Sequence, residues 1–245
     1  MWWRKPKPDA SETTALDPNL PLIRLERVSK VFQGEADELT RALDDVTADV
    51  RAGEFVTVSG PSGCGKTTFL SIVGLLDTPT SGRYLFGGRA TGELTLTQKA
   101  RMRNVDIGMV FQSFNLIGDM TVAENVDYPL VIRGVPVEER RARVAAALDR
   151  VGLTPRSKQR PGSLSGGHQQ LVAVARAIAG RPAILLADEP TGNLDSKSGE
   201  ALMQIFAELH AAGSTLCIAT HDPRWFRESQ RTIHLLDGKV VTGDA

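Results

Sequence analysis

Gly60-Pro61-Ser62-Gly63-Cys64-Gly65-Lys66-Thr67-Thr68 is the stretch of this sequence that decides its fold. It follows a β-rich run, residues 54–59, and has the GxxxxGK[ST] pattern of a phosphate-binding loop between a strand and a helix. Glycines let backbone N–H groups close around phosphate oxygens, and the following helix presents its positive N-terminal end. We therefore expect all nine residues to bind a nucleotide, with Lys66 bridging the β- and γ-phosphates and Thr67 binding Mg²⁺. A glycine-rich turn of purely structural use is the alternative, and it does not explain the strand and helix on either side.

Short apolar runs recur along the rest of the chain, at residues 22–28, 54–59, 106–111, 183–187 and 214–220. Such runs, separated by helical stretches, indicate a parallel sheet covered by helices. Residues 137–151 have helical spacing and strong helix formers, with Gly152 placed to end the helix. This helical stretch predicts an insertion in the α/β core. Near the end of the chain, residues 233–241 predict a β-hairpin with an Asp237-Gly238 turn, and residues 1–20 predict a flexible polar tail.

Two adjacent carboxylates, Asp188 and Glu189, follow the apolar run 183–187 directly. A buried strand that ends in carboxylates delivers them to the edge of the sheet where α/β proteins bind ligands. Asp188 is then the carboxylate on the magnesium side, and Glu189 is the base that polarises the attacking water. A solvated loop would also carry acidic residues, but not directly after a buried strand.

The composition limits the classes of protein and of compartment. The chain has 245 residues, 29 Lys plus Arg and 29 Asp plus Glu, so it has no net basic charge to attract nucleic acid. Its two cysteines, Cys64 and Cys217, have neither zinc-site nor disulfide-framework spacing, which fits a reduced, cytosolic setting. Cys64 lies beside Lys66 and a helix N-terminus, which favours a reactive thiol that a maleimide would modify unless ATP is bound; a buried, inert thiol is the alternative.

The stretch Leu164-Ser165-Gly166-Gly167-His168-Gln169-Gln170 resembles the signature sequence of ATP-binding cassette (ABC) proteins, and it stands about 20 residues before the acidic strand. Gln112 resembles the Q-loop residue, Asn193-Leu194-Asp195 the D-loop, His221 the switch histidine, and Phe32 the aromatic residue that stacks on adenine. The resemblance covers about residues 22–241. The sequence departs from the family pattern at His168, where glutamine is commoner, and at Leu171, where a basic residue is usual.

The resemblance implies an α/β P-loop NTPase fold: an ABC nucleotide-binding domain over residues 21–245, with a parallel core sheet, an antiparallel β subdomain and a helical subdomain inserted at about 113–165. It implies an ATPase that uses ATP and Mg²⁺, in which Gln112 and His221 sense the γ-phosphate. Thr67, Gln112 and Asp188 would hold the metal. Two copies would face each other head to tail, so that Ser165, Gly166 and Gly167 of one copy, with Asp195, complete the nucleotide site of the other.

Three further stretches, residues 74–82, 110–116 and 188–195, are similar to the ATPases of the lipoprotein-release, macrolide-export and antimicrobial-peptide-export group. That similarity implies a homodimer at the cytoplasmic face of the inner membrane, bound to an integral membrane subunit and powering export, lipoprotein release or mechanotransmission. A regulatory ABC ATPase of the cell-division type, which controls cell-wall hydrolases through a membrane partner, is the alternative. ABC ATPases of DNA or ribosomes have coiled-coil insertions or paired cassettes, which this chain lacks. A phosphate-loop kinase would leave residues 164–170, Gln112 and His221 unexplained.

Overall fold

The computed structural model describes residues 20–34 and 38–241, so the tail expected at residues 1–20 lies almost wholly outside the described range. The strands are β1 (Ile23–Gln33), β2 (Leu39–Val50), β3 (Phe55–Ser59), β4 (Ser81–Phe86), β5 (Arg89–Ala90), β6 (Ile107–Val110), β7 (Ile184–Asp188), β8 (Thr215–Ala219), β9 (Arg231–Leu236) and β10 (Lys239–Val241). The α-helices are α1 (Lys66–Val73), α2 (Leu96–Asp106), α3 (Val122–Arg133), α4 (Val137–Arg150), α5 (Gly166–Ala179), α6 (Ser196–Ala211) and α7 (Pro223–Glu228).

The core sheet has the strand order β10-β9-β3-β8-β7-β6. Neighbouring strands from β9 to β6 pair in parallel, whereas β10 pairs with β9 in the antiparallel sense. The apolar runs identified in the sequence form β3, β6, β7 and β8, and the expected hairpin forms β9 and β10. Asp237 (φ 47°) and Gly238 (φ 78°) make its turn, as two-residue hairpin loops require. The predicted parallel core is thus confirmed, with one antiparallel strand at its edge.

A second, antiparallel sheet has the order β2-β1-β4-β5. The residue pattern identified only the first half of β1, and neither β2 nor β4 was recognised. The reason lies in bulges between β1 and β2, where the pairing register shifts. Arg27 (φ 51°) and Asp45 (φ 55°) occupy the left-handed region there, and their side chains form an ion pair of 2.9 Å. A bulge interrupts the alternation of apolar and polar residues by which a strand is recognised.

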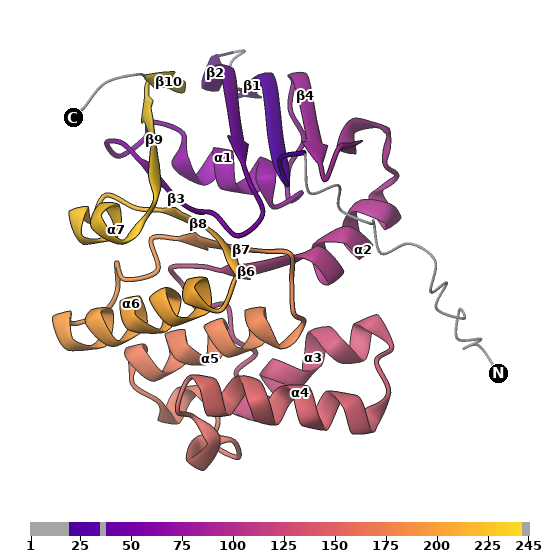
Figure 1. Ribbon diagram of the computed structural model, residues 1–245, viewed down its shortest axis with the longest axis vertical. Coiled ribbons are helices and arrows are strands. Elements are labelled where there is room, and N and C mark those ends of the chain that lie inside the picture. The colour runs from indigo at the N-terminus through magenta and orange to yellow at the C-terminus, as the bar shows by residue number, and fades with distance from the viewer. Residues whose placement is uncertain (1–19, 35–37, 242–245) are drawn as a thin grey trace.

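Helix α1 lies between the two sheets, and α5 and α6 lie on the opposite face of the core sheet (Figure 1). The α1 side chains Phe69, Leu70 and Ile72 are buried in a core shared with both sheets. On the other face, α5 and α6 pack on the strands, and Phe206 meets Trp225 edge to face at 5.4 Å. This layering leaves the N-terminal end of α1 and the carboxyl ends of the parallel strands at one edge of the molecule.

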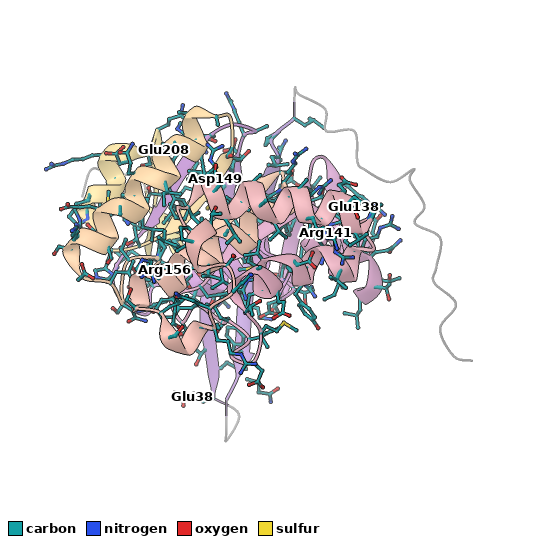
Figure 2. All side chains as sticks on the ribbon, turned by 90° about the horizontal axis from the view of Figure 1, so that it is seen from below. Glu38, Glu138, Arg141, Asp149, Arg156 and Glu208 are labelled. Carbon is teal, nitrogen blue, oxygen red and sulfur yellow. The ribbon has the colours of Figure 1, made fainter. Side chains whose placement is uncertain are left out.

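Helices α3 and α4 come between β6 and α5 in the chain and form the inserted helical segment. Helix α4 agrees with the helix expected at residues 137–151, and Gly152 (φ 70°) follows it. Figure 2 shows Glu138 and Arg141 together on this outer part of the molecule, where they form an ion pair of 3.2 Å. The described residues include no helix of the length and apolarity that crossing a membrane requires. The predicted fold class, an α/β core with an antiparallel sheet and inserted helices, is confirmed.

Candidate nucleotide site

The loop Gly60–Thr68 joins β3 to α1, and close packing requires glycine at two of its positions. Gly60 (φ 148°) would place a Cβ atom 2.1 Å from the carbonyl oxygen of Leu235, and Gly65 (φ 106°) would place one 2.4 Å from that of Ala42. Neither position can accept a side chain without movement of the backbone. The loop therefore packs between β9 and β2, and contacts with one strand of each sheet fix its backbone conformation.

Lys66 begins α1 and turns back across the loop. Its Nζ atom donates to the carbonyl oxygens of Gly60, at 2.7 Å, and Pro61, at 3.1 Å. The side chain is 9% exposed, so a lysine charge is held in a largely desolvated place. A buried ammonium next to a helix N-terminus is suited to phosphate oxygens, which would offer it the negative charge that the carbonyl groups lack.

Asp188, at the end of β7, is a half-buried carboxylate of the site. Burial raises its pKa, a hydrogen bond from Thr67 opposes this shift, and the nearby Glu189 raises the pKa further. Its Oδ1 atom is buried and has no hydrogen-bond partner among the residues that the structure describes, which is unusual for such an oxygen. An unpaired, buried carboxylate oxygen beside a threonine hydroxyl is an oxygen donor set of the type that Mg²⁺ prefers, so these residues fit a magnesium ion.

Glu189 has a backbone conformation that few non-glycine residues adopt, with φ at 44°. Its N–H donates to Ala219 of β8 at 2.8 Å, which fixes the peptide. Its Oε1 atom lies 2.9 Å from Nδ1 of His221, and its Oε2 accepts a hydrogen bond of 3.0 Å from the Thr220 hydroxyl. The carboxylate is thus oriented by two residues of the neighbouring strand end, which is how a general base is held.

Gln112 follows β6 and faces the segment after Glu189. The Gln112 carbonyl accepts a hydrogen bond of 3.1 Å from the Asn193 amide, and the Gln112 side-chain amide reaches the Asn193 side chain at 3.5 Å. A Cβ atom on Gly192 would lie 2.8 Å from Nε2 of Gln112. Gln112 therefore lies on the same edge of the sheet as Asp188 and Glu189, as β6 and β7 are neighbours.

Ser165, Gly166 and Gly167 form the N-terminal tip of α5, apart from the phosphate loop. Ser165 caps the helix, and its Oγ lies 2.8 Å from Nδ1 of His168. A Cβ atom on Gly167 would lie 2.6 Å from the Ser198 hydroxyl, so the tip packs on the start of α6. Asp195 caps α6 and accepts hydrogen bonds from the Ser198 N–H and hydroxyl, which lower its pKa. The tip and Asp195 thus form a second group.

Two more predicted residues have distinct surroundings. Phe32 lies on β1 and is 43% exposed, with the Lys30 ammonium 4.9 Å from the centre of its ring. An exposed ring of this kind is available for stacking. Cys64 is 3% exposed, so the structure favours the buried, inert thiol over the reactive one. Its neighbours include the hairpin turn, because the Gly238 N–H donates to the Cys64 carbonyl at 3.1 Å.

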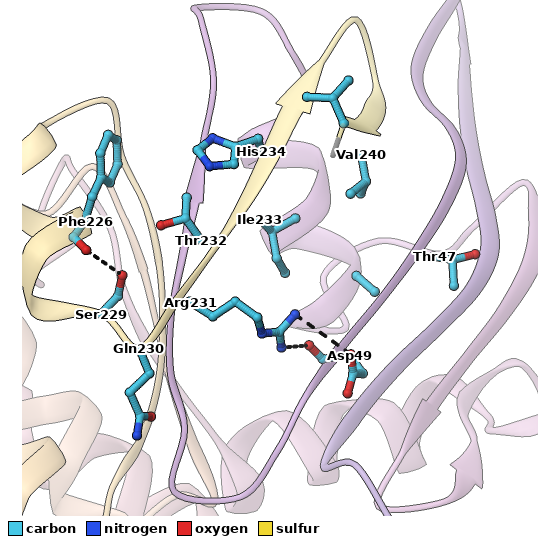
Figure 3. A pocket seen from close by; sticks show the side chains of 12 residues that line it. Thr47, Asp49, Phe226, Ser229, Gln230, Arg231, Thr232, Ile233, His234 and Val240 are labelled. Carbon is cyan, nitrogen blue, oxygen red and sulfur yellow. Dashed lines mark hydrogen bonds and ion pairs between the residues drawn. The ribbon is translucent and has the colours of Figure 1, made fainter. Parts of the chain in front are cut away.

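Several residues at this edge were not identified from the sequence. Thr220 directly follows β8 and could have been found by the rule that identified Asp188, since both come after a run of apolar residues. His234 could not have been found in this way, because its contact is with a distant part of the chain. Its Nδ1 atom lies 2.7 Å from the hydroxyl of Ser59, the residue before the phosphate loop. His234 also lines an open pocket of about 680 Å³ between β2 and β9, in which Arg231 pairs with Asp49 (Figure 3).

The comparisons with known proteins agree on one family. The sequence profile of the family described as "ABC transporter" matches residues 43–192. The chain is 45% identical over 222 residues to the macrolide export ATP-binding/permease protein MacB of Brucella melitensis, with 91% of this chain and 34% of that protein covered. It is 43% identical over 221 residues to MacB 1/2 of Paracoccus denitrificans, with 90% and 33% covered. The chain therefore spans about a third of the length of these relatives.

Among solved structures, the dimeric post-hydrolysis state of the ATP-binding cassette MJ0796 bound to ADP and Pi is similar, with a TM-score of 0.82 and 41% identity over 89% of this chain and 96% of that one. CbiO1 of Clostridium perfringens, part of the ABC transporter complex cbiONQ, has a TM-score of 0.80 and 27% identity, covering 91% and 87%. With the fold, the profile match and the near-complete coverage of MJ0796 in agreement, this chain belongs to the ABC transporter family, as one of its ATP-hydrolysing cassettes.

Proposed function

We propose that the chain binds Mg-ATP in the cradle of Lys66, Thr67, Asp188 and Glu189, and that it works as a head-to-tail dimer whose closure drives a membrane-embedded partner. The observation that carries the dimer is the division of the site within one chain. The cradle lies at the ends of β3, β7 and β8, whereas the tip Ser165–Gly167 packs on α6. A second copy would bring its own tip to the cradle of the first.

The chemistry of the two groups is complementary. Lys66 and the loop N–H groups neutralise phosphate charge from one side. The tip of α5 offers further N–H groups and the Ser165 hydroxyl at a helix N-terminus, where anions are stabilised. ATP would therefore contact both chains and favour the closed dimer, and hydrolysis would remove those contacts. The similar cassette MJ0796 is a dimer with ADP and Pi, which supports this arrangement.

In the cradle, each residue would have one task. Mg²⁺, when bound by Thr67 and Asp188 with Gln112 nearby, would neutralise charge on the phosphates. Glu189 accepts a proton from the attacking water, while Thr220 and His221 hold its carboxylate in place. His221, with a side chain 74% exposed, would reach the γ-phosphate. Phe32 would stack on the adenine ring.

A mixing experiment tests the head-to-tail arrangement. Lys66→Ala damages the cradle, and Gly166→Asp places a carboxylate at the tip, where a side chain fits 3.7 Å from Phe114 but repels phosphate. Each variant alone forms dimers with two defective sites, whereas a mixed dimer has one fully intact site. We expect ATP-driven dimerisation, measured by light scattering, to be greater in the mixture than in either variant alone. Dimerisation of the mixture no greater than that of the better variant would contradict the arrangement.

The surface for the membrane partner is proposed on α3. Tyr128, Val131 and Ile132 lie on one face of this helix and are 43%, 45% and 63% exposed. The opposite face, including Val126 and Leu130, is buried against α5. Apolar residues gathered on one face of a surface helix mark a contact surface, and the relatives named ATP-binding/permease proteins join a cassette to a permease. We infer that a permease component covers this face and that the chain is held at the membrane through it.

A substitution on α3 separates docking from ATP hydrolysis. Ile132→Asp puts a charge in the centre of the exposed apolar face, and we expect binding to native membranes to weaken about tenfold or more. The ATPase rate of the isolated chain should stay unchanged, because Ile132 contacts no residue of the cradle. Val241→Asp, an equivalent change at an exposed position on β10, is the matched control. Sedimentation with membranes measures the effect; equal loss in both variants would refute docking through α3.

A further inference from the structure

Gln170 is a buried polar side chain that the proposed chemistry does not use. It lies on α5, five residues after Ser165, and is 0% exposed. Its Nε2 atom donates to two backbone carbonyl groups, that of Pro190 at 2.9 Å and that of Phe111 at 3.3 Å. Pro190 directly follows Glu189, and Phe111 directly precedes Gln112. One amide group therefore connects α5 to the chain neighbours of both Glu189 and Gln112.

The side-chain amide of Gln170 is held in one orientation, and this orientation leaves a buried acceptor unpaired. Both neighbours are carbonyl oxygens, so the NH₂ end must face them, and Oε1 is left buried with no partner in the described part of the chain. An unpaired buried acceptor is unfavourable, and an apolar side chain of the same shape would avoid it. The amide therefore stabilises the structure through its two donated hydrogen bonds. These connect α5 to residues that lie 59 and 20 positions from Gln170 in the chain.

A second side chain of α5 holds the far end of the same loop. Arg176 donates to the carbonyl oxygens of Phe114, at 2.9 Å, and Asn115. Both residues have left-handed backbone conformations, with φ at 59° and 49°. Burial of Arg176 lowers its pKa. The segment from Phe111 to Asn115, which contains Gln112, is thus attached to α5 at both ends and must follow this helix when it moves.

The helix geometry connects this attachment to the tip. Gln170 is five residues from Ser165, or about 7.5 Å along a rigid helix at about 1.5 Å per residue. A displacement of the tip is therefore transmitted to Gln170 with little loss. Glu189 is sensitive to such a displacement, because its peptide is held by Ala219 on one side and its neighbour Pro190 by Gln170 on the other.

Resting on the proposed head-to-tail dimer, we propose that Gln170 is a positioning residue that couples the two ATP sites. In that dimer the tip of α5 touches one ATP, whereas Gln112 and Glu189 of the same chain act on the other. Contact of the tip with its ATP fixes the position of α5. Gln170 then places the Gln112 and Glu189 peptides in their working positions. Each site becomes competent when the opposite site is filled.

The test is Gln170→Met, which keeps the length of the side chain, removes both donated bonds and removes the unpaired acceptor. ATP hydrolysis by the full chain is measured against ATP concentration, and affinity is measured with a fluorescent ATP analogue. We expect kcat to fall about 10- to 100-fold, as the loss of buried hydrogen bonds at a site predicts. The Hill coefficient should fall from about two toward one, whereas the ATP affinity should stay within about threefold, since the phosphate loop is untouched.

The matched control is Gln204→Met on α6, whose exposed amide donates to Glu208; it should leave every parameter unchanged. A purely structural role for Gln170 would lower the unfolding temperature and the active fraction without changing the Hill coefficient, and would overturn the proposal. So would a wild-type Hill coefficient near one, or a Gln170→Met kcat within twofold of wild type. A wild-type chain that neither binds nor hydrolyses ATP would instead refute the proposed function itself.

A second variant, Gln170→Glu, tests the same proposal if Gln170→Met does not fold. Gln170→Glu has the shape of the natural side chain, and its protonated carboxyl can donate one hydrogen bond in place of two. We expect kcat and Hill coefficient between the values for wild type and those of an uncoupled enzyme. Wild-type values for both would overturn the proposal.

Discussion

Glu189→Gln is expected to lower kcat for ATP hydrolysis about 10²- to 10⁴-fold, the range over which general bases contribute. The amide has the shape of the carboxylate; its oxygen can accept a hydrogen bond from Thr220 or His221 and its NH₂ group can donate to the other, so the site keeps its structure. Only the proton acceptor is lost, and that acceptor is needed in the transition state. ATP should therefore bind normally, and the closed dimer should accumulate. Phosphate release and size-exclusion chromatography with ATP measure the two effects.

The control for this variant is Glu124→Gln. Glu124 forms the capping box at the start of α3 with Thr121, and glutamine serves equally in such a box. Its ATPase rate should equal that of wild type, which shows that a Glu-to-Gln change is harmless elsewhere. Turnover near the wild-type rate in Glu189→Gln would contradict the role of Glu189 as the base.

Lys66→Ala is expected to weaken ATP binding about 10- to 100-fold. The ammonium lies over the loop on Gly60 and Pro61, and each charge-assisted hydrogen bond to phosphate is worth about 1.5–3 kcal/mol. The loss falls on binding itself, so both dimer closure and hydrolysis disappear at ATP concentrations that saturate the wild type. Titration with a fluorescent ATP analogue gives the dissociation constant.

The chain offers a matched control in Lys99. This lysine of α2 is also 9% exposed, but it lies outside the phosphate loop. Lys99→Ala removes the same charge from a place of the same burial and should leave ATP affinity within about twofold, since no phosphate contact is lost. An equal loss of affinity in both variants would show that net charge, and not the position of Lys66, determines binding.

The residues proposed to act on the nucleotide could be named from the sequence because their residue types are local in the chain. The loop 60–68 carries its glycines and Lys66 in sequence, and Asp188 and Glu189 follow their strand directly. The resemblance to ABC proteins then added Gln112, Ser165 and His221, which no local pattern would identify. Thr220 and His234 were not predicted. Thr220 bonds to Glu189 and His234 contacts Ser59, and in each pair the two residues are far apart in the sequence.

The expectation for Cys64 shows the limit of such reasoning. Position beside Lys66 and a helix N-terminus favoured a reactive thiol, and the sequence could not decide whether reagents reach it. The structure buries the side chain under the β9–β10 hairpin. Accessibility is a property of the packed loop and its neighbours, which come from the far end of the chain.

By itself, the sequence determined the apolar strands of the core sheet, the hairpin at residues 233–241, the phosphate loop and the acidic strand end, because these depend on residue types at fixed short spacings. Only the tertiary structure decided the bulged pairing of β1 with β2, the burial of Cys64, the exposed face of α3 and the contacts of Gln170. Each of these depends on how segments far apart in the chain pack against one another. Local helix and strand propensities do not specify such contacts, because they describe each segment by itself.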